Sequence, residues 1–383
     1  MKASLGSVCR FLNGGTPSKA VAEYFDGDIP WITSADIAGP IAGYARSFIT
    51  DEAVKNSAVN KVAAGTVLLV TRTGVGKVAI AAKELCFSQD ITALIPDSEK
   101  LDASYLVHFL RTKKEHFLGL SRGATIQGIT RNVVSDLSIP LPPLPEQRRI
   151  AAILDQADAL RAKRREALAQ LDSLTQSIFI EMFGDTHEIY VRWPTKPLGD
   201  ILEFMTSGSR GWAEYYSESG ALFLRIQNVC KDELRLSDVA YVNAPDSAEA
   251  RRTEVREGDV LLSITADLGR TAVIPAGLGK AHINQHLSIL RTRAVAPRYL
   301  SAFLSSPAGQ REVMGRNKQG VKAGLNFDDI RSFRIPLPPE PYQAEYVRRA
   351  HLVRAQVVSQ QTSIVELDAL FASLQHRAFP GEL

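Results

Sequence analysis

The stretch that comes closest to a chemical site is the glycine-containing segment TRTGVGK at residues 71–77. Its GVGK end resembles a loop that cradles phosphate groups with backbone N–H groups and a lysine. Such a loop needs a glycine five residues before Gly76 and a serine or threonine directly after the lysine. The sequence has Thr71 and Val78 at these positions. A hairpin turn that carries an exposed cation is therefore the favoured interpretation.

Other motifs that carry catalysis or metal binding are absent from the sequence. It contains no HExxH zinc helix, no GxSxG nucleophile turn and no GxGxxG dinucleotide loop. The prolines of LPPLP lack the preceding Asn or Asp with which amino-methyltransferases hold a base. Cys9, Cys86 and Cys230 lie far apart and the histidines are dispersed, so neither a disulfide framework nor a metal site is predicted. We therefore expect a chain without catalytic chemistry of its own.

Residues suited to nucleic-acid recognition lie in loops at corresponding positions of the two halves of the chain. Lys and Arg bind phosphates, while Arg, Gln and Asn can bind base edges through two hydrogen bonds. The alternative for each residue is an ordinary solvated side chain, and the recurrence in both halves favours binding. The candidates are Thr33, Ser34, Arg72, Thr73, Lys77, Arg122, Gln127 and Arg131 in the first half, and Arg225, Gln227, Asn228, Thr265, Asp267, Arg270, Lys318, Lys322 and Asn326 in the second.

These loops recur because the sequence is an internal repeat. Residues 139–183 align with residues 335–379 at a constant offset of 196, with 13 identities in 45 positions. The upstream blocks that repeat are GTVLLV (65–70) with GDVLLS (258–263), and SYLVHFL (104–110) with RYLSAFL (298–304). The chain therefore contains two diverged copies of one unit, each a globular domain followed by a helix.

Each globular part mixes short β-rich runs with helical patches, which predicts an α/β or α+β fold. Each IPLPP segment must be extended, because proline lacks an amide hydrogen and disfavours helix in the residue before it. Pro145 and Pro341 are expected just before the long helices begin. The predicted divisions are domains at 1–138 and 185–334, and proline-rich segments with their helices at 139–184 and 335–383.

The two long helices, at about 146–183 and 342–378, carry apolar residues in a heptad pattern and are expected to pack as an antiparallel, coiled-coil-like pair. Arg164 and Gln360 occupy equivalent central positions. They are expected to form a polar layer, unless both point to solvent. The residues assigned to the helix starts and the seam are Pro145, Gln147, Ile150, Leu160, Arg164, Leu171, Leu174, Pro341, Gln343, Val353, Gln360, Leu367 and Leu370.

The composition sets only broad limits. At 383 residues, 45% hydrophobic and 23% charged, the sequence is typical of globular domains. A net charge of +3 permits basic patches without arguing for nucleic acid. No apolar run approaches the length of about 18 residues that a membrane span needs, and the start does not resemble a signal peptide. We expect a soluble cytoplasmic protein.

The order of these elements closely resembles the specificity (S, HsdS) subunits of type I restriction–modification systems. The resemblance covers essentially the whole chain and is carried by the doubled IPLPP-x-P-x-Q segment, by GTVLLVTRTGVGKVAI (65–80) and by AFPGEL (378–383). It implies two target recognition domains that each bind one half of a bipartite, double-stranded DNA sequence. The helix pair would fix the spacing of the half-sites.

The resemblance also implies partners. Two modification subunits would dock on the helices and domains, and two restriction subunits would complete the nuclease. S-adenosylmethionine, ATP and magnesium would then belong to the partner subunits, and this chain would hold no cofactor and no metal.

Two functions of other classes remain open at this point. A duplicated orphan nuclease is disfavoured because PDSEK (96–100) lacks suitably spaced partners and has no counterpart in the second copy. A non-catalytic structural adaptor would bridge two proteins through its helices. DNA cleavage by the lone chain would favour the nuclease, and a lack of salt-dependent DNA binding would favour the adaptor.

Overall fold

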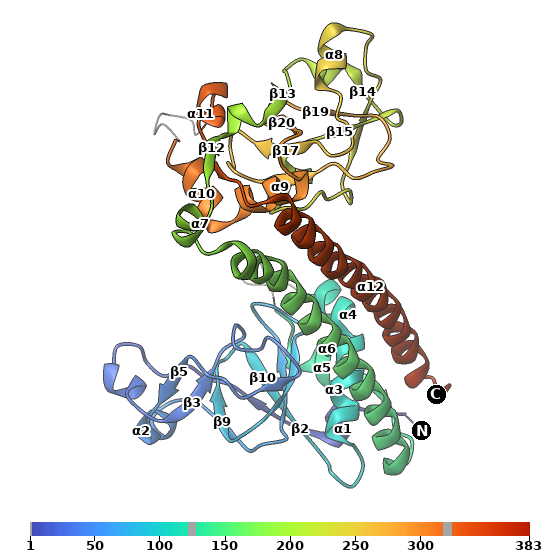
Figure 1. Ribbon diagram of the computed structural model, residues 1–383. Coiled ribbons are helices and arrows are strands. Elements are labelled where there is room, and N and C mark those ends of the chain that lie inside the picture. Colours follow the sequence, from blue (N-terminus) through green and yellow to red (C-terminus); the bar gives the residue numbers. More distant parts are fainter. Residues whose placement is uncertain (1, 122–127, 317–323) are drawn as a thin grey trace. The chain divides into compact units, whose positions relative to one another are not determined.

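The computed structural model describes residues 2–121, 128–316 and 324–383 (Figure 1). The chain forms two compact units. The first consists of Met1–Arg165 together with Ser363–Leu383, and the second of Glu166–Thr362. Each unit therefore combines strands and short helices with a part of both long helices.

The first unit is built on a five-stranded sheet in the order β2-β10-β7-β8-β4 and a four-stranded sheet in the order β5-β3-β9-β6. Its strands are Lys2–Ser4 (β1), Cys9–Asn13 (β2), Ile29–Ile32 (β3), Ile41–Ala42 (β4), Ser47–Ile49 (β5), Lys61–Val62 (β6), Val67–Val70 (β7), Val78–Ala81 (β8), Leu85–Phe87 (β9), Ile91–Pro96 (β10) and Ser138–Pro140 (β11). Its short helices are Leu5–Val8 (α1), Asp51–Lys55 (α2), Ala103–Thr112 (α3), Lys114–Leu120 (α4), Arg131–Ser135 (α5) and the 3-10 turn Ala22–Phe25 (η1).

The layering of this unit explains why β7 is apolar at every position. Val67 and Leu69 pack into a cluster that includes α3, while Leu68 and Val70 pack into a second cluster with strands of the other sheet. Because side chains alternate along a strand, covering both faces requires a continuous apolar run such as VLLV. A helix, a central sheet and a second sheet thus form three layers.

The second unit repeats this plan with sheets in the orders β13-β20-β17-β18 and β14-β16-β15-β19. Its strands are Thr195–Pro197 (β12), Leu202–Ser207 (β13), Tyr216–Ser217 (β14), Ala221–Leu224 (β15), Ala240–Val242 (β16), Val260–Ser263 (β17), Thr271–Val273 (β18), Ala281–Ile283 (β19), Leu287–Thr292 (β20) and Arg334–Pro336 (β21). Its short helices are Glu188–Arg192 (α7), Ala248–Thr253 (α8), Pro297–Ser305 (α9), Pro307–Met314 (α10) and Phe327–Arg331 (α11), with 3-10 turns at Leu198–Asp200 (η2), Trp212–Tyr215 (η3) and Ile226–Asn228 (η4).

The ends of each domain are tied together beside the start of its long helix. β1 pairs antiparallel with β11, and β12 pairs antiparallel with β21. A tyrosine of the nearby short helix seals each junction: the hydroxyl of Tyr105 donates to the carbonyl of Pro140 at 3.2 Å, and that of Tyr299 to Pro336 at 2.9 Å. The repeated YL of the sequence is thus a repeated structural contact.

The long helices are Leu144–Phe183 (α6) and Glu340–Ala378 (α12). Pro145 and Pro341 lie inside their first turns, so the prediction that they precede the helices was wrong. The first turn tolerates proline because its N–H groups have no partner within the helix. The predicted helix starts were about two residues late.

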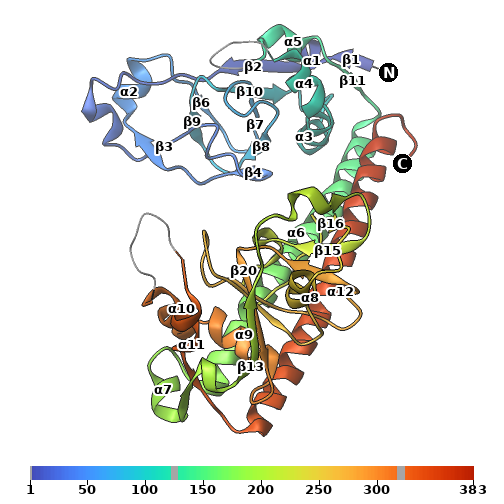
Figure 2. The same cartoon turned by 90° about the horizontal axis from the view of Figure 1, so that it is seen from above.

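Within each unit, the two long-helix segments run antiparallel against each other. In the first unit Arg161 Nε donates to Asp368 Oδ1 at 2.5 Å, and the Arg161 guanidinium lies 4.3 Å from the ring centre of Phe371. In the second unit the ring centres of Phe179 and Tyr346 lie 5.4 Å apart. Figures 1 and 2 both place α9 beside the first part of α12.

The buried stripe of these helices differs from the predicted heptad. Ile150 and Val353 are buried as expected, whereas Leu160, Leu174 and Leu370 are 51%, 41% and 50% exposed. Their assignment to a buried seam was wrong. Ala157, the heptad position after Ile150, is buried as predicted, but so is Leu154, which lies outside the predicted seam. These residues pack against both α3 and α12. The buried positions of α6 therefore follow the 3.6-residue period of a helix with a broad apolar face.

The remaining seam residues are partly accessible. Leu171, Leu367 and Gln360 are half-buried, while Arg164 is exposed. The burial expected of a polar layer is therefore found in part at Gln360 and not at Arg164.

At the level of class, the prediction of mixed α/β domains with long helices is confirmed. No helix within the described ranges is long and apolar enough to cross a membrane.

Candidate nucleic-acid interface

The glycine turn of the first unit joins β7 to β8 and carries Arg72, Thr73 and Lys77. Its backbone enters the left-handed region at three positions, with φ of 49° at Thr73, 109° at Gly74 and 89° at Gly76. A Cβ at Gly76 would also lie 2.9 Å from a neighbouring lysine side chain, so glycine is needed there for both reasons. The turn leaves Arg72, Thr73 and Lys77 exposed.

The late loop of the first unit lies directly beside this turn. Arg72 and Gly128 form an isolated antiparallel bridge, and the N–H of Ile129 donates to the carbonyl of Thr71 at 2.9 Å. Two segments that the sequence linked only by their composition are therefore joined through backbone hydrogen bonds.

Arg131 lies at the end of this loop as the first residue of α5. It is exposed, and its guanidinium lies 5.3 Å from the ring centre of Phe11. Ring contact restrains the side chain while its N–H groups stay accessible. The predicted residues Arg122 and Gln127 lie outside the described residues.

The second unit contains the same junction. Thr265 and Gly324 form an isolated antiparallel bridge, and the N–H of Leu325 donates to the carbonyl of Ile264 at 2.9 Å. The glycine turn here has φ of 64° at Ala266 and 82° at Gly269. Both units thus join a glycine turn to a late loop in the same way.

Asn326 follows this junction as the N-cap of α11. Its side chain accepts from the N–H of Asp329 at 2.8 Å, and the Asp329 carboxylate accepts from the N–H of Asn326 at 3.0 Å. The residue is exposed, but part of its hydrogen-bonding capacity holds the helix start. The predicted residues Lys318 and Lys322 lie outside the described residues.

The loop after β3 completes the surface of the first unit. Lys77 Nζ donates to the carbonyl of Ser34 at 3.1 Å, which fixes this loop to the glycine turn. Thr33 donates from its N–H and its hydroxyl to Asp36, and Arg46 donates to Asp36 at 2.6 Å. Burial raises the pKa of Asp36, but the bonds from Thr33 and Arg46 outweigh it, so the pKa is lowered and the carboxylate stays charged. Ser34 is buried and contributes its backbone.

The corresponding loop of the second unit is organised by Asp238. Arg225 pairs with Asp238 at 3.2 Å, and Gln227 donates to it at 2.7 Å. Asn228 is 1% exposed; its carbonyl oxygen accepts from the N–H of Arg225, and its amide donates to two backbone carbonyls. Asn228 holds the loop in shape, so its assignment as a base-reading residue needs correction: its polar atoms are already used inside the protein.

The cationic residue of the second glycine turn is held internally. Arg270 Nε donates to Asp267 at 2.7 Å and its NH1 group to the carbonyl of Val229 at 3.5 Å. Thr265 Oγ1 lies 2.5 Å from His286 Nδ1. Within the described residues, the second glycine turn is therefore less cationic than the first, where Arg72 and Lys77 are exposed.

The glutamine of the proline-rich segment has a specific structural role. Gln147 is fully buried, and its side chain accepts from the N–H of Asp102 at 2.9 Å. Its amide donates to the carbonyls of Lys100 and Pro142 at 2.8 and 2.9 Å. One side chain therefore connects the start of α3, the proline-rich segment and α6.

Gln343 makes the equivalent contacts in the second unit. It accepts from the N–H of Ala296 and donates to the carbonyl of Pro338, both at 2.8 Å. The sequence identified these glutamines as part of the motif but not the carbonyls that they satisfy.

Asp36 and Asp238 position the candidate residues but were not among the residues predicted from the sequence. The signal for Asp36 was present, since a threonine followed three residues later by Asp is a known local capping pattern. Among the residues that the structure describes, no group of histidine, cysteine, aspartate or glutamate side chains is arranged to hold a metal ion.

Comparison with known proteins places this geometry in a class. Residues 1–170 match the type I restriction modification DNA specificity domain. The chain is similar to the type I restriction enzyme MjaIX specificity subunit of Methanocaldococcus jannaschii, with 24% identity over 97% of the chain and 90% of that protein. It is also similar to the putative type I restriction enzyme MjaX specificity subunit of the same organism, with 30% identity over 72% of the chain and 67% of that protein.

Solved structures show the same fold. The S subunit of a type I restriction–modification system from M. genitalium superposes with a TM-score of 0.63, covering 99% of this chain and 96% of that one at 16% identity. A structure from a study of complex assembly and conformational transition of the type I system gives a TM-score of 0.62 at 21% identity, covering 100% of this chain and 98% of that one.

The chain belongs to the family of type I restriction enzyme specificity subunits. It is therefore a non-catalytic subunit that confers DNA sequence specificity, as its resemblance implied. The matches give no support to an orphan nuclease or a structural adaptor.

Proposed function

We propose that each unit binds one half of a bipartite duplex sequence through its glycine turn and late loop. The observation that carries this proposal is the repeated junction, in which Arg72 pairs with Gly128 and Thr265 with Gly324. Each junction projects polar side chains from rigid backbone, which suits base recognition because a readout residue must be held in register.

The two surfaces differ in charge, which supports different half-sites. Arg72 and Lys77 are exposed cations suited to phosphates or to guanine, whose major-groove edge offers two acceptors. Asp267 is exposed and suited to accept from a cytosine amino group. A chain with two unlike readers binds an asymmetric target.

The long helices are proposed to set the half-site spacing and to dock two modification subunits, with two restriction subunits completing the enzyme. α6 contains 40 residues, which corresponds to about 60 Å at 1.5 Å per residue. Half-sites on one face of the duplex are separated by multiples of about 34 Å. We propose that 1–138 and 185–334 are the target recognition domains and that 139–184 and 335–383 are the spacer segments, related by a pseudo-two-fold axis.

S-adenosylmethionine, ATP and magnesium are proposed to bind the partner subunits, and the complex is proposed to act on DNA in the cytoplasm. Methyl transfer and DNA cleavage would then take place on the partner subunits, and this chain would determine which DNA sequence is bound.

The decisive experiment maps methylated bases in cells that express this chain with its modification subunit. A bipartite motif that appears only with this chain is expected. Deleting two turns of α6 should change the spacing or abolish assembly and leave the bases of each half unchanged. Altered half-sites after that deletion would contradict the spacer assignment. Cleavage of duplex DNA by the lone chain with magnesium would contradict the division of labour.

A further inference from the structure

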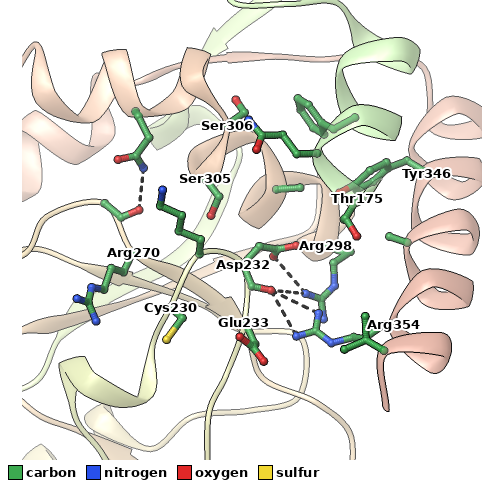
Figure 3. A pocket seen from close by; sticks show the side chains of 18 of the residues that line it. Thr175, Cys230, Asp232, Glu233, Arg270, Arg298, Ser305, Ser306, Tyr346 and Arg354 are labelled. Atoms are coloured by element: carbon green, nitrogen blue, oxygen red, sulfur yellow. Dashed lines mark hydrogen bonds and ion pairs between the residues drawn. The ribbon is translucent and has the colours of Figure 1, made fainter. Parts of the chain in front are cut away.

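The second unit contains a cavity of about 900 Å³ beside the joint between α9 and α12 (Figure 3). It is lined by about two turns of α6, the loop at residues 230–235, the glycine turn, α9, α10 and α12. All of these segments belong to the second unit. The volume lies in the range of pockets that bind small molecules.

The same joint of the first unit is bridged by two side-chain pairs between α3 and α6. His108 Nε2 lies 2.8 Å from Asp155 Oδ1, and Arg111 donates to Asp158 at 3.1 Å. Arg161 adds a second cation to Asp158 at 2.8 Å. Basic groups on the short helix thus meet carboxylates on the long helix.

The alignment of the two copies shows what replaces these pairs. His108 and Arg111 correspond to Ala302 and Ser305 on α9, by the match of SYLVHFL with RYLSAFL. Asp155 and Asp158 correspond to His351 and Arg354 on α12, at the offset of 196. At these positions the short helix of the second unit carries small uncharged side chains, and its long helix carries basic side chains where the first unit has acidic ones. All four replacing residues line the cavity.

The charges around the cavity do not balance. Three carboxylates line it, and each is held by one arginine: Asp232 by Arg298 at 3.1 Å, Glu233 by Arg235 at 2.8 Å, and Asp267 by Arg270 at 2.7 Å. Lys231 and Arg354 also line it and form no ion pair with a carboxylate in the described part of the chain. Two positive charges are therefore left over in a concave site.

Arg354 is the stronger indication of an anion-binding site, because its side chain is half-buried. Its guanidinium donates to the backbone carbonyl of Asp232, at 3.4 and 3.5 Å, while Arg298 donates to the carboxylate (Figure 3). Burial, and then repulsion from Arg298, lower the pKa of Arg354, and the attraction of Asp232 and Glu233 does not restore it. A half-buried cation beside another cation gains from an added anion.

We propose that this cavity binds a small organic phosphate, whose dianionic group contacts Arg354 and Lys231. The lining also includes the rings of Phe179 and Tyr346 and the side chain of Leu268, which suit the uncharged body of such a molecule. A phosphate monoester carries about two negative charges at neutral pH and so matches the surplus. The first unit offers no such site at this joint, because Arg111 and Arg161 are already paired with Asp158 and the ring of His108 contacts Asp155.

The test measures binding of AMP, inorganic phosphate and adenosine to the purified full chain by isothermal titration calorimetry. AMP is expected to bind with one site per chain, more tightly than phosphate or adenosine alone. R354Q should weaken AMP binding by about tenfold or more, since it removes a charged hydrogen-bonding partner. The matched control is R293Q, which changes an exposed arginine that does not line the cavity and should leave binding unchanged.

A second variant separates a lost site from a lost fold. Ser305→Leu fills space beside the cavity without adding a charge, keeps Arg354, and should block AMP while the chain retains its thermal unfolding profile. The proposal is overturned if AMP does not bind at millimolar concentration, or if R293Q weakens binding as much as R354Q. It is also overturned if AMP fails to bind while R354Q weakens binding of the modification subunit, because a partner carboxylate then fills the site. These readouts do not involve DNA recognition, so the proposed function can stand or fail independently.

Discussion

The two units use one scaffold with two different joints between a short helix and a long helix. Both joints share the buried glutamine and the tyrosine that donates to a proline carbonyl. They differ one helical turn further on, where the first unit has side-chain pairs and the second has small residues opposite cations. The glutamine and tyrosine contacts are therefore common to both copies, whereas the side chains between the short and the long helix differ.

The shared contacts involve backbone groups, and the divergent ones involve side chains alone. Gln147 and Gln343 satisfy backbone groups next to prolines, where few other residues offer a donor and an acceptor together. A pair such as Arg111 with Asp158 can be replaced by any combination that leaves no isolated buried charge. Divergence is therefore expected at the second kind of position.

The largest predicted effect comes from opening the first joint. Leu154 is fully buried, and its counterpart Ala350 lines the cavity of the second unit. Leu154→Ala should cost the first unit about 3 kcal/mol, because it leaves a hole among packed side chains. Ala350→Leu should change the stability of the second unit by less than about 1 kcal/mol, because space is available. Hydrogen exchange resolved by unit measures both.

Leu160→Ala is the control for that pair, since Leu160 is half exposed and should contribute less than about 0.5 kcal/mol. Equal effects of Leu154→Ala and Leu160→Ala would restore the heptad seam and contradict the buried stripe described above.

The next effect tests the shared contact. Gln147→Leu and Gln343→Leu should each destabilise their own unit by about 2 kcal/mol, because buried backbone groups lose their partners. Amide exchange at Asp102 and Ala296, the two N–H donors to these glutamines, should accelerate in the matching variant only. Acceleration in both units from one substitution would show that the joints are not independent.

The difference between the two DNA-binding surfaces should produce a change of comparable size. Arg72→Ala should weaken recognition of one half-site by about 1 to 3 kcal/mol and leave the other half intact. Methylation of duplexes with substitutions in either half, by the chain assembled with its modification subunit, measures this. Lys83→Ala is the control, as Lys83 is exposed and lies outside the glycine turn. Relaxed preference at both halves would contradict one reader per unit.

The smallest effect is a pH dependence confined to the first joint. Burial lowers the pKa of His108 below its usual 6.5, and the opposing attraction of Asp155 does not restore it. The unfolded chain then binds more protons than the folded one, so stability is complete above pH 6.5 and falls as the pH drops below it. The slope is at most about 1.4 kcal/mol per pH unit.

Exchange rates of α3 and α9 amides at pH 7.5 and pH 5.5 measure this difference, since Ala302 replaces the histidine in the second unit. His108→Ala should remove the extra sensitivity of α3. A drop in stability that persists in His108→Ala would assign the titration to another group.

The repeat, the domain class and the two long helices could be predicted from the sequence because they are periodic properties of many residues. The heptad prediction failed at Leu160 and Leu174 because it assumed one packing partner, whereas α6 also packs against α3. The assignment of Asn228 failed because side-chain type does not reveal whether its polar atoms are already used. The junction of Arg72 with Gly128 depends on a pairing between distant segments, which composition does not encode.

The division of the long helices between the units has a consequence for synthesis. Phe371 and Ala378 follow the whole second unit in the chain, yet they belong to the core of the first unit. The first unit can therefore be completed only after the whole second unit has been translated. Until then the apolar residues that pack against Phe371 and Ala378 stay exposed. A chain truncated before Phe371 would leave them permanently accessible to chaperones and proteases.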